Sequence, residues 1–84
     1  MSENKIMKCN ENLRLRKEEA TGSEVITTMQ KGTKVKVIKL GKAETIDGIS
    51  SNWVQIEIQS GAKDRDGKQI APGTTGWCYG GYLE

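Results

Sequence analysis

The chain contains the stretch Trp53-Val54-Gln55-Ile56-Glu57-Ile58. Its valine and two isoleucines recur at every second position, with polar residues between them. Because successive side chains of a β-strand point to opposite faces, this period predicts a strand with one face in a core. Trp53 falls on the other face, which the pattern directs towards solvent.

Other segments of the chain show the same period. It recurs in Leu13–Arg16 and in Lys34–Val37, and shorter apolar segments occupy Val25–Met29 and Trp77–Tyr79. Asp47-Gly48 is a strong hairpin signal and predicts a turn that returns the strand from Lys34 into the strand of Trp53. No stretch has the apolar spacing of a long helix.

Five to six short strands with turn signals between them predict an all-β fold, a small antiparallel barrel. The inward positions of the alternating segments predict its core. The expected core residues are Leu13, Leu15, Val25, Val35, Val37, Val54, Ile56, Ile58 and Cys78.

The chain has 84 residues, which predicts one domain. Its composition argues against an enzyme, because it has no histidine and no phosphate-binding loop. Two cysteines without histidine cannot supply the four ligands of a structural zinc site, so neither a metal nor a cofactor is expected. No apolar run is long enough to span a membrane, and the polar first residues do not resemble a signal peptide.

Charge is unevenly distributed along the chain. Residues 1–42 carry a net charge of +5 and residues 43–84 a net charge of −3. Five lysines lie between Lys31 and Lys42 with no acid among them. They fit a solvated strand face that blocks edge-to-edge pairing, or a stripe that meets an anionic polymer. A total net charge of +2 is weak for nucleic-acid binding, which is therefore not the favoured function.

Four stretches, taken in order, resemble the bacterial Src-homology-3-like domain family. Glu11–Arg16 is similar to its opening "LNVR" motif, Val25–Val37 to its "VI..L.KGTKVTV" segment, Trp53–Ile56 to "W.KV", and Gly76–Leu83 to the closing "GWV...YL". The resemblance implies a barrel over residues 9–84, preceded by a flexible extension at residues 1–8. It also implies a monomeric, non-catalytic binding module of the cell envelope or the extracytoplasmic space.

By resemblance, Trp53, Tyr79 and Tyr82 fall on the positions that line the family's ligand groove. We expect these rings to form an exposed aromatic surface for a bacterial cell-wall polymer or an extended peptide. The alternative for the rings is that they only cover the ends of a small barrel. The alternative for the function is a structural or protein–protein interaction domain that uses the long loop Gln59–Thr75.

The chain departs from the family pattern in two connections, Gly41–Asn52 and Gln59–Thr75. Within the second, Asp64-Arg65-Asp66-Gly67-Lys68 is interpreted as a turn, because it lacks the further oxygen ligands of a calcium loop.

Arg14 and Arg16 are expected to pair with nearby acids and so fix the first loop; the alternative is that they contact a ligand. Cys9 and Cys78 are expected to be neighbours. They fit either a disulfide, as in an exported domain, or two buried thiols.

Overall fold

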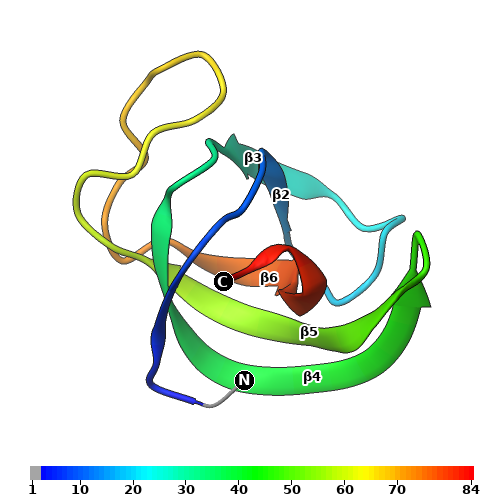
Figure 1. The fold of residues 1–84 in the computed structure, drawn as a ribbon. Coiled ribbons are helices and arrows are strands. Elements are labelled where there is room, and N and C mark those ends of the chain that lie inside the picture. The colour runs from blue at the N-terminus through cyan, green and yellow to red at the C-terminus, as the bar shows by residue number, and fades with distance from the viewer. Residues whose placement is uncertain (1–2) are drawn as a thin grey trace.

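The computed structural model describes residues 3–84, which form six antiparallel strands and one 3₁₀ turn (Figure 1). The elements are β1 (Ile6–Lys8), β2 (Leu13–Arg16), β3 (Val25–Met29), β4 (Lys34–Ile46), β5 (Ile49–Ile58), β6 (Thr75–Tyr79) and η1 (Gly80–Tyr82). The strands make one curled sheet in the order β1-β4-β5-β6-β2-β3. The all-β antiparallel fold predicted from the sequence is confirmed.

The longest pairing joins β4 to β5 through the two-residue turn Asp47-Gly48. Both turn residues have left-handed φ angles, 52° and 78°, as this tight hairpin turn requires. Ile46 and Ile49 pair directly beside the turn, which confirms the predicted hairpin. The segment Gly41–Asn52 was expected to be a connection, but it continues both strands up to this turn.

A bulge bends β4 where its pairing with β5 shifts between Leu40 and Ala43. Gly41 lies in this bulge, and a Cβ atom there would stand 2.5 Å from the ring of Trp77 and 3.0 Å from the carbonyl oxygen of Trp53. The absence of a side chain therefore lets the bent strand lie close to its neighbours.

The two ends of the described chain pair with each other. Lys8 and Glu84 exchange two backbone hydrogen bonds of 2.8 Å, and Cys9 pairs with Leu83. Strand β1 also pairs with the start of β4. Residues 6–8 of the expected N-terminal extension thus form a paired strand, because the edge of β4 offers their backbone groups a partner. Residues 1 and 2 lie outside the described part.

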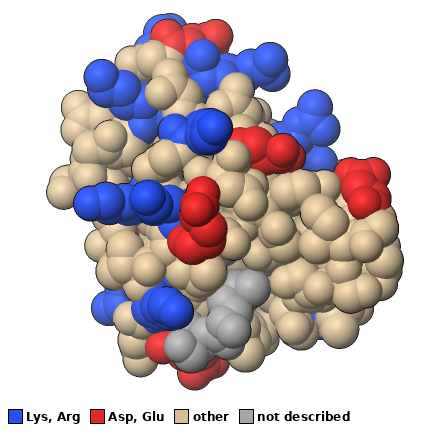
Figure 2. All heavy atoms as spheres, viewed as in Figure 1, with Lys and Arg blue, Asp and Glu red and all other residues tan. Residues whose placement is uncertain are grey.

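The lysines of β4 lie on the outer face of the sheet. Lys34 and Lys36 alternate with the buried Val35. Lys34 is exposed directly opposite Lys8 of β1, whereas Lys36 is half-buried opposite Glu57 of β5. Basic side chains gather on the side that holds β1 and the start of β4, and the lower right of the same view is largely uncharged (Figure 2).

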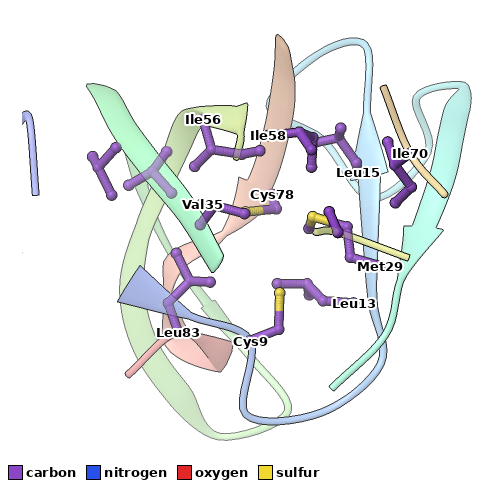
Figure 3. Close-up of a cluster of buried hydrophobic side chains, with 13 residues drawn as sticks. Cys9, Leu13, Leu15, Met29, Val35, Ile56, Ile58, Ile70, Cys78 and Leu83 are labelled. Carbon is purple, nitrogen blue, oxygen red and sulfur yellow. The ribbon is translucent and has the colours of Figure 1, made fainter. Parts of the chain in front are cut away.

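The core fills the inside of the curled sheet (Figure 3). Eight of the nine predicted core residues are buried, but Val25 is 40% exposed. The pairing of β2 with β3 shifts beyond Leu15, which places Val25 opposite the outward-facing Arg16. The core also contains Cys9, Met29, Ala62, Ile70 and Leu83.

The two cysteines are free thiols within this core. Burial raises the pKa of the Cys9 thiol to about 11. Burial, together with the nearby Cys9, also raises the pKa of the Cys78 thiol. Of the two expected states, the structure has the unbridged one.

The long connection between β5 and β6 is folded against the barrel. Ala62 and Ile70 bury their side chains in the core. The Arg65 amide donates a hydrogen bond of 3.1 Å to the Thr28 carbonyl of β3. The loop thereby extends the sheet beyond β3 and forms the yellow lobe at the top of Figure 1.

Candidate ligand-binding groove

An open groove of about 640 Å³ lies between β2, the tip of the β4–β5 hairpin and the loop after β5. The end of η1 forms one of its walls through Tyr82. Aromatic rings, two acids and arginines line it, together with neutral residues that include Thr28. Its lining includes Trp53, Tyr79 and Tyr82, then Glu11 and Asp47, then Arg14, Arg16 and Arg65.

The three predicted aromatic residues do come together. The ring centroids of Trp53 and Tyr79 are 5.6 Å apart and those of Tyr79 and Tyr82 are 5.9 Å apart, both in edge-to-face geometry. However, Trp53 is only 2% exposed and Tyr79 only 3%. The expected exposed aromatic surface is therefore wrong for these two residues, and only Tyr82 is partly exposed.

The burial of Trp53 and Tyr79 has a structural cause. The 3₁₀ turn η1 directly follows β6 and places Gly81 against the Tyr79 ring, and that ring packs edge-to-face on Trp53. A Cβ atom on Gly81 would stand 2.7 Å from that ring and 2.7 Å from Ile49. The outer face is thus covered at this end of the barrel, where the alternation within β5 predicts exposure.

The polar atoms of the two buried rings are bonded within the protein. The Trp53 indole Nε1 donates to the Glu44 carboxylate at 2.7 Å. The single O–H of Tyr79 is shared between the backbone carbonyl oxygens of Glu44 and Ile49. These bonds tie β5 and β6 to the far end of the hairpin and hold the aromatic wall in one position.

Tyr82 closes the wall on the side of the hairpin turn. Its hydroxyl donates a hydrogen bond of 2.9 Å to the Asp47 carboxylate. This bond, followed by partial desolvation and by the negative charges of Asp47 and Glu11, raises the pKa of Tyr82. The acidic side of the groove therefore lies around this ring.

The arginines of β2 are not in the expected ion pairs. Among residues 3–84 the ion pair found joins Lys17 to Glu24, at 3.1 Å. Arg16 does fix the first loop, but its Nη1 donates to the Ser23 carbonyl at 2.9 Å. Arg14 is exposed on the wall of the groove.

Sequence reasoning did not identify Arg65 and Asp47 as groove residues. Asp47 was recognised only as a turn residue. Arg65 belongs to the segment Asp64–Lys68, whose sequence predicts a turn. That turn is confirmed, because the Asp64 carboxylate accepts the amides of Asp66 and Lys68 at 2.9 Å each. Within the described range, no cluster of side chains has the composition of a metal site.

The six antiparallel strands form a small, curled barrel-like sheet with a groove between its loops. A comparison with family models matches residues 11–84 to the bacterial SH3 domain. The chain belongs to this family, which confirms the resemblance seen in the sequence. Members of the family are generally binding modules rather than catalysts. No curated protein and no solved structure gave a significant match.

Between residues 3 and 84, no helix has the length and apolar character that crossing a membrane requires.

Proposed function

We propose that this domain binds an extended peptide in the groove beside Tyr82, either a protein segment or the peptide part of a bacterial cell-wall polymer. The observation that carries the proposal is the groove itself, which combines an aromatic wall with charged side chains on both sides. Its volume falls in the range of ligand sites. Extended peptides dock in aromatic-lined grooves of this kind in other small domains.

The rigidity of the aromatic wall supports this function. Hydrogen bonds hold Trp53 and Tyr79, and the Asp47 carboxylate holds the hydroxyl of the partly exposed Tyr82. A surface that is ordered before the ligand arrives loses little entropy when the ligand binds. Trp53 and Tyr79 support the wall from behind, and Tyr82 meets the ligand.

The test uses two probes, purified peptidoglycan in a pull-down and a fluorescent mixed-sequence octapeptide library in anisotropy. We expect the domain to bind at least one probe and Tyr82→Ala to weaken that binding about tenfold. Lys39→Ala, on the exposed outer face of β4, is the control and should bind as the wild type does. Failure of both probes to bind, or equal binding by Tyr82→Ala, would contradict the proposal.

A second candidate is a protein–protein interface on the loop Gln59–Thr75. Its tip is exposed at Lys63 and Lys68, on residues that do not line the groove. If Lys63→Ala together with Lys68→Ala weakened binding while Tyr82→Ala did not, the loop would be the binding surface.

A further inference from the structure

The two kinds of basic residue are separated on the surface. The chain has three arginines and ten lysines, all of which lie within residues 3–84. All three arginines line the groove, and none of the lysines does. Arginine presents a planar fork of N–H donors that matches a carboxylate, whereas lysine is a hydrated point charge. This distribution favours a ligand whose oxyanion, a carboxylate or a phosphate, is held in a defined orientation.

Two of these arginines lie in one row across the sheet. Arg14 on β2 is directly opposite Thr28 on β3. On the other edge of β3, Asp64 pairs with Met29, and the Arg65 amide bonds to the Thr28 carbonyl at 3.1 Å. Neighbouring strands are about 4.8 Å apart, so the two arginine backbones are about 10 Å apart with Thr28 between them. Both long side chains can reach a group held over the Thr28 hydroxyl.

Arg14 and Arg65 are free to bind a ligand. Both are exposed, and neither forms an ion pair or a side-chain hydrogen bond with any residue from 3 to 84. Arg16 differs, because its guanidinium group already bonds to the Ser23 carbonyl. The first two arginines therefore provide the donors for a ligand, and Arg16 shapes the adjacent loop.

The acids of the groove limit what else can bind. Glu11 and Asp47 lie around Tyr82, and Glu11 precedes Arg14 by three residues, a span of at most about 10 Å. A uniformly anionic polymer such as a nucleic acid would place phosphates beside these carboxylates and be repelled. A peptide can carry one carboxylate at the arginines and neutral groups elsewhere.

We propose that Arg14 and Arg65 clamp a carboxylate of an extended acidic peptide over Thr28, with the rest of the peptide running towards Tyr82. This inference rests on the proposed peptide function and names its ligand class. The carboxylate is that of a Glu or Asp side chain or of a peptide C-terminus.

The probes are four fluorescent N-acetylated octapeptide libraries that differ at one fixed residue and at the C-terminus. The first has one Glu and an amidated C-terminus, the second has Gln in place of that Glu, the third has Gln and a free C-terminal carboxylate, and the fourth has Lys. We expect the Glu library or the free-carboxylate library to bind about tenfold more tightly than the amidated Gln library. Whichever of the two binds more tightly identifies the source of the carboxylate.

The variants test the two arginines separately. Arg14→Gln and Arg65→Gln should each remove most of the preference for the acidic libraries, and Arg65→Lys should restore only part of it. Lys39→Gln is the matched control, because it removes one positive charge from an exposed position outside the groove. Thermal unfolding of each variant shows that loss of binding is not loss of the fold.

The outcomes separate this inference from the proposed function. Equal binding of the Glu and Gln libraries, with both weakened by Tyr82→Ala, would overturn the carboxylate clamp and leave the peptide function standing. A single-stranded oligonucleotide that binds more tightly than every peptide library would overturn the clamp in favour of a polyanion. Absence of binding to all four libraries would overturn the clamp, and the proposed function would then depend on the peptidoglycan probe alone.

Discussion

The hydroxyl of Tyr82 donates a hydrogen bond of 2.9 Å to the carboxylate of Asp47, 35 residues earlier in the chain. Tyr82 ends η1, and Asp47 is the first residue of the β4–β5 turn. The bond therefore joins the two walls that meet at the acidic side of the groove.

This bond makes the titration of Tyr82 depend on Asp47. The pKa of Tyr82 is raised above its ordinary value of 10.0, with the hydrogen bond as the largest cause. The bond needs the protonated phenol, so its stabilising effect is complete below pH 10.0 and is lost as the pH rises through the folded-state pKa. Asp47→Asn removes the carboxylate charge and should lower the Tyr82 pKa, as measured by NMR of labelled tyrosine.

Asp66→Asn is the control for that titration, because it removes an exposed acid outside the groove. It should leave the midpoint of Tyr82 unchanged. A midpoint that Asp47→Asn fails to lower would contradict the assigned cause of the shift.

Gly81 is expected to tolerate no side chain. In Gly81→Ala the new methyl group would lie 2.7 Å from the Tyr79 ring and from Ile49. We expect this crowding to lower the free energy of unfolding by about 1–3 kcal/mol in urea denaturation. In Gly22→Ala, where nothing lies within 4 Å of the new atom, stability should stay within about 0.5 kcal/mol. Equal stability of the two variants would show that η1 does not pack as described.

The hydrogen bond between Trp53 and Glu44 predicts a second difference in stability. Glu44→Ala leaves the indole N–H of Trp53, which is 2% exposed, without its acceptor, at a cost of about 1–3 kcal/mol. Glu44→Gln keeps an oxygen acceptor at the same position and should retain most of the stability. If both variants lost the same amount, the carboxylate charge would matter more than the hydrogen bond.

Ile56 tests the inward face of β5. It is completely buried, and its truncation in Ile56→Ala should cost about 2–5 kcal/mol in the free energy of unfolding. Ile38→Ala, at a position 37% exposed, removes the same atoms and should cost less than about 1 kcal/mol. A loss below about 1 kcal/mol at Ile56 would mean that the strand faces the other way.

The two thiols should be unreactive until the barrel unfolds. Cys9 and Cys78 are buried, and burial raises the pKa of both, so little thiolate forms near neutral pH. We expect slow modification by a disulfide reagent in the native state and rapid modification of both thiols in unfolded, unreduced protein. Absence of thiol reactivity after unfolding would indicate a disulfide.

The features that the sequence predicts correctly are local ones, the direction of side chains within a strand and the position of a tight turn. Alternation within one strand fixes which residues share a face, so the inward positions of β4 and β5 are correct. The turn at Asp47 is also a local property, since it depends on adjacent residues that adopt left-handed φ angles. The prediction that Val25 lies in the core is wrong because the register shift between β2 and β3 cannot be seen in the sequence of either strand alone.

The candidate site depends on contacts between segments that are distant in the sequence. The alternation of apolar and polar residues within one strand carries no information about such contacts. The pattern predicts an exposed Trp53, but η1 and the end of the hairpin cover that face. The position of Arg65 in the groove depends on the pairing of its loop with Thr28, 37 residues earlier. Nothing in the local sequence of either segment indicates that pairing.

The pairing of Cys9 with Leu83 has a consequence for synthesis of the chain. The sheet closes only when these two residues meet, and within this domain Leu83 is synthesised after all six strands. Until Leu83 leaves the ribosome, β1 pairs with β4 on one edge and has no partner on the other. The apolar interior therefore stays open at the seam where Cys9 later meets Leu83. Contacts between residues far apart in sequence also form slowly. The barrel therefore cannot be completed strand by strand as the domain is synthesised, and until Leu83 has emerged the open seam is exposed to association with other chains.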